Sequence, residues 1–333
     1  MEKLLSLIVL LLGFIRLYGQ EDVMLSELNP ATVNMDFGDY DPATALYMGQ
    51  LSELAYWKAD QLEGLFNRVD SLYPESNLHY QFLDNEKTHT QALLWCTKNF
   101  LVIAFRGTEP SKLRDWLSDA KFWNYENNPS QNVSLANMPP GHGGFRKSLM
   151  ELITEKEIFH EIDKIVKKSS PEANLSEFPV YLTGHSLGAA ISQLFIECLH
   201  YKKYNFAGAY HFAPPLAVSC SLSEYMKANF GDRVYDIVNY KDYIPRAGRN
   251  GVAHFGKFYR ICDDNLLYKE ETAYVRFSGR EYFFALKYHK LSNHLRAIRD
   301  ASNSSAAISG RSDVPFGCMG EGIRYVDPCA ETP

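Results

Sequence analysis

A serine set between closely spaced glycines is the residue of this sequence best suited to nucleophilic chemistry. Residues 180–195 read VYLTGHSLGAAISQLF, an apolar run that stops at Gly184 and resumes with small residues after Gly188. This matches the pattern G-x-S-x-G, with His185 and Ser186 at its centre. A strand before the pattern and a helix after it predict a nucleophile elbow, a tight strand-to-helix turn that presents the serine. A buried serine that merely ends a strand is the alternative.

A serine hydroxyl needs a base, and the base needs a carboxylate that orients it. In chains with a nucleophile elbow these partners follow the serine in the order acid, then histidine. The predicted acid is Asp242, which lies beyond a predicted strand in the segment VYDIVNYKDYIPR. A turn-forming role is the alternative for an Asp after a strand. Asp236 falls inside that strand and is predicted to be a surface or edge residue.

Three histidines, His254, His289 and His294, follow Asp242 in the chain. His254 directly precedes a predicted strand and is too early for the role. His289 lies just before the last predicted helix, whereas His294 lies within it. A base on a connecting loop reaches the carboxyl edge of a sheet more easily than one in a helix. His289 is therefore the predicted base, and His294 is the alternative.

The negative oxygen formed during acyl transfer needs two hydrogen-bond donors. One is predicted to be the backbone N–H of Leu187, which follows the serine. The second is predicted at Thr108 in the segment FRGTEP, after the apolar run at residues 101–105. A simple turn around Gly107 is the alternative for that segment.

These residues must be positioned by alternating strands and helices, which predict a mainly parallel sheet covered by helices on both faces. Functional groups gather at the carboxyl ends of the strands in such sheets. Residues 124–143 are polar and predicted to be a loop. The predicted strands are 79–83, 92–97, 100–105, 180–183, 206–212, 233–238 and 257–262, and the predicted helices are 42–55, 145–168, 187–204, 222–229 and 291–301.

The composition is that of a globular chain, and the N-terminal segment predicts export. The 333 residues are 46% hydrophobic and carry a net charge of −6, which argues against a nucleic-acid partner. Lys3 and the apolar stretch at residues 4–15 predict a signal peptide over residues 1–19, and thus a secreted or periplasmic protein. An apolar anchor that stays attached is the alternative. Residues 20–333 are predicted to be one domain with its core at about residues 42–300.

The six cysteines do not predict a metal site, since none has the C-x-x-C spacing of structural zinc sites. Cys96 and Cys198 lie in apolar runs and are predicted to be core residues. Cys318 and Cys329 flank a short glycine-rich tail, where a local disulfide is one of the pairings that the spacing allows.

Five segments together resemble the class 3, or fungal-type, lipases of the α/β-hydrolase superfamily, over about residues 42–300. The resemblance implies the α/β-hydrolase fold, with Ser186 as nucleophile, Asp242 as acid and Thr108 as an oxyanion donor. His289 fits as the base, but His294 then occupies a position where the family usually has a tyrosine. The segments are FRGTEPSKLRDWLSDAKF, GHGGF, TGHSLGAA, NYKDYIPR and HKLSNHLRAI, and they occur in the order found in the family.

The resemblance implies a serine carboxylester hydrolase that uses no metal or organic cofactor and acts on acylglycerols, with transient contact to a lipid surface. A phospholipase A1 and a feruloyl-type esterase are alternatives because they use the same residues. An exported binding protein without activity is a further alternative. Residues 109–119 have too small an apolar face for a typical lid, so residues 124–143 and 263–287 are expected to shape the acyl pocket. Oligomeric state and preferred head group are not predicted.

Overall fold

The computed structural model describes ten segments of the chain. The predicted signal peptide, Thr108, residues 109–119 and the cysteines Cys318 and Cys329 lie outside the described residues, as does most of 263–287. The described segments are 24–36, 38–85, 90–107, 125–126, 141–239, 241–242, 244–246, 252–261, 267–270 and 288–303.

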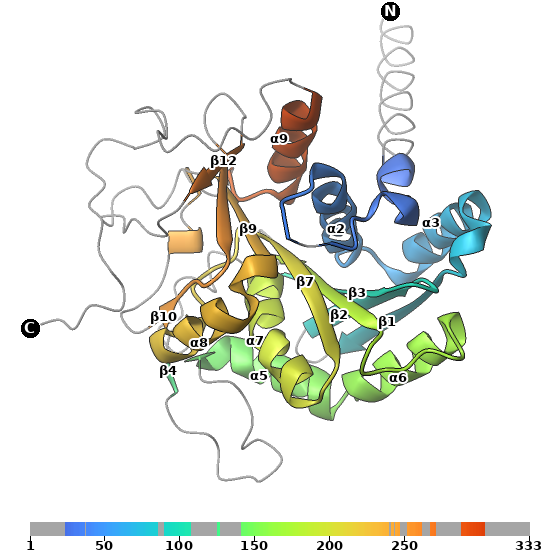
Figure 1. Cartoon of the computed structure of the whole chain (residues 1–333), viewed down its shortest axis with the longest axis horizontal. Coiled ribbons are helices and arrows are strands. Elements are labelled where there is room, and N and C mark those ends of the chain that lie inside the picture. The colour runs from blue at the N-terminus through green and yellow to red at the C-terminus, as the bar shows by residue number, and fades with distance from the viewer. Residues whose placement is uncertain are drawn as a thin grey trace, which may run out of the picture.

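An eight-stranded sheet forms the centre of the fold (Figure 1), in the order β1-β2-β3-β6-β7-β9-β11-β12. The five strands β3, β6, β7, β9 and β11 run parallel, while the three outer pairings are antiparallel. This confirms the predicted mainly parallel sheet. The strands are β1 (His79–Asn85), β2 (Thr90–Cys96), β3 (Leu101–Phe105), β6 (Pro179–His185), β7 (Asn205–Phe212), β9 (Val234–Asn239), β11 (Lys257–Ile261) and β12 (Leu267–Glu270).

Helices cover both faces of the sheet, as predicted. One apolar core joins the sheet to α5 (Gly143–Thr154), α6 (Ile158–Ser169), α7 (Leu187–Tyr201) and α8 (Cys220–Phe230). A second core joins the opposite face to α2 (Pro42–Leu54), α3 (Ala59–Leu72) and α9 (Leu291–Asn303). Strand β3 divides its side chains between the two cores: Leu101, Ile103 and Phe105 face the first, whereas Val102 and Ala104 face the second. Such alternation is what a strand buried on both faces requires.

Two predicted elements differ from the structure, and one helix was not predicted. The single helical region at 145–168 is two helices, because the chain turns at Glu157, which has a left-handed φ of 46°. The predicted loop at 124–143 contains two-residue strands, β4 (Tyr125–Glu126) and β5 (Gly141–His142). These pair with β8 (Val218–Ser219) and β10 (Val252–Ala253) in a second small sheet. Helix α3 is absent from the predicted elements, although Leu62, Leu65 and Val69 have helical spacing and are buried.

The prediction that Asp236 is a surface or edge residue is wrong. Strand β9 lies inside the sheet, between β7 and β11, and the Asp236 side chain is fully buried. A buried carboxylate is tolerated only when polar groups compensate for its lost hydration. His211 on β7 does so here, because its Nδ1 lies 2.9 Å from the Asp236 Oδ1.

The start of α2 and the two buried cysteines agree with the sequence. Asp41 caps α2, since its Oδ2 accepts a hydrogen bond of 2.7 Å from the backbone N–H of Thr44. Cys96 and Cys198 are buried free thiols, which confirms their prediction as core residues, and Cys220 is disulfide-bonded.

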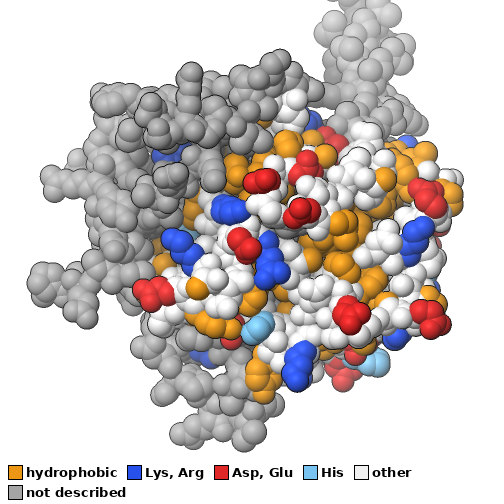
Figure 2. All heavy atoms as spheres, in the orientation of Figure 1, with side chains coloured by type: hydrophobic (Ala, Val, Ile, Leu, Met, Phe, Trp, Pro, Cys, Tyr) orange, Lys and Arg blue, Asp and Glu red, His pale blue; other side chains and the backbone are white. Residues whose placement is uncertain are grey.

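Figure 2 shows acidic and basic side chains interspersed over one face. Among the described helices, none combines the length and the hydropathy needed to cross a bilayer.

Candidate active site

Ser186 lies at the junction of β6 and α7, where the sequence predicts it. Its backbone has φ 58° and ψ −125°, a strained conformation for a residue with a side chain. The turn is held because the Ser186 N–H donates to the carbonyl of Phe212 at 2.9 Å and the Ser186 carbonyl accepts from Ala190 at 3.2 Å. The fold therefore fixes this serine at the carboxyl end of a central strand.

The glycines beside Ser186 are needed for space. A Cβ atom at Gly184 would lie 2.5 Å from the carbonyl carbon of Gly188 in α7. A Cβ at Gly188 would collide with the carbonyl group of Phe105 at the end of β3, with its carbon only 2.7 Å away. Helix α7 thus crosses the ends of β6 and β3 at backbone contact distance, which agrees with the steric reason for the G-x-S-x-G pattern.

Asp242 and His289 meet at the same edge of the sheet. The Nδ1–H of His289 donates to the Oδ2 of Asp242 at 2.7 Å. The other carboxylate oxygen, Oδ1, accepts from the backbone N–H of Ile244 at 3.0 Å. Asp242 is fully buried and His289 is 4% exposed, so the pair is shielded from water. Because Nδ1 carries the donated proton, Nε2 of a neutral His289 has a free lone pair for a base.

His185 joins the elbow to the loop that carries His289. Its Nε2 lies 2.6 Å from the backbone carbonyl of His289, and its Nδ1 lies 3.0 Å from the hydroxyl of Tyr56. A carbonyl only accepts, so Nε2 carries the proton and Nδ1 accepts from Tyr56. Burial lowers the pKa of His185 well below its ordinary value, and the nearby His289 and His294 lower it further. A neutral His185 therefore holds the His289 backbone beside Ser186.

The candidate nucleophile and the candidate base each keep one atom available. The Oγ of Ser186 and the Nε2 of His289 are buried, and neither makes a hydrogen bond to the described residues. Leu187 is the first residue of α7, where backbone N–H groups are unpaired and attract negative charge. Gly107, the residue before Thr108, is buried against the backbone of His185 and the hydroxyl of Tyr56. The start of the predicted oxyanion segment therefore packs on the elbow.

His294, the alternative base, lies in α9 and is fully buried. Its Nδ1 lies 3.1 Å from the backbone carbonyl of Lys290, one turn earlier in the chain. Burial is the largest cause that lowers the pKa of His294 to about 4, while the nearby Asp242 partly offsets it. Burial thus favours the neutral form of His294, and the hydrogen bond to Asp242 is made by His289.

We expect a low pH to reduce the free energy of unfolding, because His294 is protonated more readily in the unfolded chain than in the folded protein. The folded-state pKa of about 4 lies below the unfolded value of about 6.5, so the unfolded chain binds the proton more readily. Stability should therefore fall as the pH drops from about 6.5 to about 4, by up to about 3 kcal/mol from this group. Denaturant unfolding across this range measures the effect. His294→Asn keeps a donor near the Lys290 carbonyl but does not titrate, so an equally steep pH dependence in this variant would contradict the assignment.

Sequence reasoning missed Tyr56 and the Ile244 N–H, which support His185 and Asp242. Tyr56 precedes His185 by 129 positions and belongs to no motif, so nothing in the sequence marks the contact.

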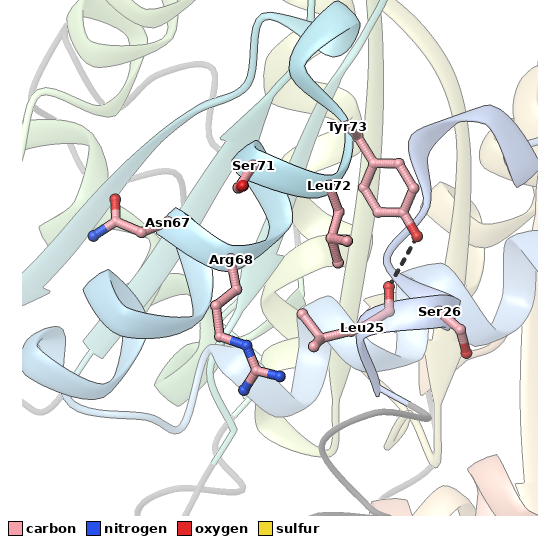
Figure 3. A pocket seen from close by; sticks show the side chains of 7 residues that line it. All are labelled: Leu25, Ser26, Asn67, Arg68, Ser71, Leu72 and Tyr73. Carbon is pink, nitrogen blue, oxygen red and sulfur yellow. Dashed lines mark hydrogen bonds between the residues drawn. The ribbon is translucent and has the colours of Figure 1, made fainter.

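Figure 3 shows a pocket between Leu25 and the end of α3, where the Tyr73 hydroxyl donates to the Leu25 carbonyl at 3.3 Å. None of the candidate site residues lines this pocket. The described segments contain no cluster of three or more ligand-type side chains placed to hold a metal ion.

Comparisons with known proteins show that the chain resembles lipases. The family model for lipase (class 3) matches residues 102–250, a range that includes Ser186 and Asp242 and ends before His289. Over this range the chain is similar to the class 3 lipases. Its central sheet and helices form the α/β-hydrolase fold. Because the match ends before His289, the assignment of the base depends on the contact with Asp242.

Three known proteins are similar to this chain. It is 27% identical over 258 residues to triacylglycerol lipase OBL1 of Arabidopsis thaliana, covering 63% of this chain and 47% of that protein. It is 26% identical over 194 residues to the secreted mono- and diacylglycerol lipase A of Penicillium cyclopium, covering 57% and 58%. The chain thus spans about half the length of these curated relatives. The crystal structure of a mutant form of MDLA from Penicillium cyclopium superposes with a TM-score of 0.55 at 21% identity, covering 75% of this chain and 96% of that one.

Proposed function

We propose that this protein is a secreted serine carboxylester hydrolase of the lipase type. In this proposal Ser186 is the nucleophile, His289 is the general base and Asp242 orients His289. The observation that carries the proposal is the 2.7 Å bond between His289 Nδ1 and Asp242 Oδ2. This bond directs the His289 Nε2, which has no hydrogen-bond partner among the described residues, away from Asp242. The strained Ser186 lies at the same edge of the sheet. The match of residues 102–250 to the family model for lipase (class 3) supports it.

The reaction follows from these positions. The Oγ of Ser186 attacks the carbonyl carbon of the ester while the Nε2 of His289 takes the hydroxyl proton. The negative oxygen is bound by the backbone N–H groups of Leu187 and Thr108. Collapse of this intermediate breaks the bond to the alcohol, which leaves with the proton from His289. Water then repeats the sequence on the acyl-enzyme and releases the acid, and the Asp242 carboxylate stabilises the imidazolium of His289 while it holds the transferred proton.

Acylglycerols are the proposed substrates, with transient contact to a lipid surface. The names of two relatives support this class, because one is called a triacylglycerol lipase and the other a mono- and diacylglycerol lipase. Relatives named as secreted support export from the cell. The same residues would serve a phospholipase A1 or a feruloyl-type esterase, so the acyl and head-group preference must be measured.

Labelling with a fluorophosphonate probe tests the proposal directly. The parent protein should be labelled at Ser186, and Ser186→Ala should lose both the label and at least about 10³-fold of its activity on p-nitrophenyl esters. Rates that increase from acetate to longer acyl chains would support the lipase assignment, whereas activity confined to short esters would support an esterase. A folded parent that neither takes the label nor cleaves any ester would overturn the proposal in favour of a binding protein.

A further inference from the structure

A second group of polar side chains lies inside the protein and contains none of the candidate catalytic residues. We call Ser192, His211, Asp236 and His254 the Asp236 cluster. The side chains of Ser192, His211 and Asp236 are fully buried, and that of His254 is 1% exposed. His211 and Asp236 are register neighbours on β7 and β9, while Ser192 comes from α7. Burying four polar side chains in a core costs free energy, so we expect this arrangement to serve a purpose beyond packing.

The cluster is connected at one end to α7 and at the other end to the loop of Asp242. His211 contacts the Asp236 carboxylate through Nδ1 and the Ser192 hydroxyl through Nε2, both at 2.9 Å. His254 places its Nδ1 3.9 Å from the other Asp236 oxygen. The Nε2–H of His254 donates to the backbone carbonyl of Pro245 at 2.8 Å.

The Pro245 carbonyl belongs to the turn that holds Asp242. This turn is the 3-10 helix Ile244–Arg246, and its first N–H donates to the Asp242 Oδ1 at 3.0 Å. The other oxygen of Asp242 accepts from His289. A continuous path of hydrogen bonds and one rigid proline therefore leads from His254 to the base.

From these contacts we propose, on the basis of the function proposed above, that His254 is a positioning residue for catalysis. It holds the Pro245 carbonyl, keeps the Ile244 N–H directed at Asp242 and so fixes the carboxylate against His289. Loss of the donor frees the turn to move, which loosens the bond between Asp242 and His289. A displacement of about 1 Å in such a group lowers the rate by about 100-fold.

The test compares two replacements that differ in one donor. His254→Met fills a similar volume without an N–H, whereas His254→Gln can present its Nε2 amide near the position of the imidazole Nε2. With p-nitrophenyl butyrate, His254→Met should lower kcat by about 10- to 100-fold with little change in KM. Its acid limb in the pH profile of kcat/KM should move to lower pH, because a loosened carboxylate stabilises the His289 cation less. His254→Gln should recover most of kcat.

Ser192→Ala is the matched control for a merely structural role. It removes one hydrogen bond at the α7 end of the same cluster and leaves the Pro245 contact in place. It should lower stability while leaving kcat and the acid limb unchanged. Equal kinetic effects in Ser192→Ala and His254→Met would overturn the proposal, as would unchanged kinetics in a folded His254→Met. If His254→Met does not fold, His254→Asn, whose shorter side chain withdraws the donor from Pro245, takes its place with the same expectations.

A measurement that does not depend on enzymatic activity distinguishes this inference from the proposed function. The Nδ1–H of His289 should give a low-field proton NMR signal, assigned by its loss in Asp242→Asn. The signal should weaken or shift in His254→Met and persist in His254→Gln and Ser192→Ala. An inactive parent that shows this pattern would contradict the proposed function and leave the positioning role supported. An unchanged signal in His254→Met would contradict the positioning role even in an active enzyme.

Discussion

Replacing His289 by alanine should lower kcat for ester hydrolysis by about 10⁴-fold or more, with little change in KM. The variant keeps Ser186 but removes the only Nε2 that Asp242 orients in the described site. Without a base the hydroxyl attacks as a poor nucleophile, and the alcohol leaves without a proton donor. Kinetics on p-nitrophenyl butyrate, at a pH above the acid limb of the parent, measure the loss.

His294→Asn is the matched control for that experiment. It replaces the alternative base, which is also buried, and retains a donor near the carbonyl of Lys290. We expect kcat within about tenfold of the parent, because His294 acts only through packing and its backbone contact. A large loss in His294→Asn together with an active His289→Ala would assign the base to His294 instead.

Local patterns around the nucleophile could be predicted because they reflect nearby physical constraints. A strand that ends at His185, the strained turn at Ser186 and a helix that begins at Leu187 are contained in sixteen consecutive residues. Helical and strand periodicities are likewise local, so most elements of the sheet and of its two helical layers follow from the sequence. The parallel order then brings Asp242 and His289 to the same edge as Ser186.

Contacts between distant segments could not be predicted in the same way. The position of Asp236 depends on which strand pairs with which, and the sequence alone does not show that β9 lies between β7 and β11. His254 precedes a strand and is unsuited to the base, yet the fold brings it to the carbonyl of Pro245. Tyr56 contacts His185 across 129 positions. Each case depends on tertiary packing rather than on spacing along the chain.

Gly188→Ala should destabilise the protein by more than about 3 kcal/mol and lower its activity as well. The added Cβ would collide with the carbonyl of Phe105 and would lie 2.9 Å from the carbonyl carbon of Arg106. These are backbone atoms of β3 and of the segment that leads to Gly107, so no side-chain rotation relieves the contact. Helix α7 would have to move off the sheet, or the segment before Thr108 would have to move away from the elbow. Thermal and denaturant unfolding measure the loss.

Gly64→Ala in α3 is the matched control, because it makes the same chemical change in another helix. A Cβ at Gly64 meets no atom within 4 Å, and α3 has helical geometry throughout Ala59–Leu72. Alanine there should stabilise the protein by up to about 1 kcal/mol, since it lowers the entropy of the unfolded chain. The two variants should thus shift the unfolding midpoint in opposite directions. A Gly188→Ala protein as stable as the parent would show that α7 does not cross β3 at backbone contact distance, and the steric account of the elbow would then be wrong.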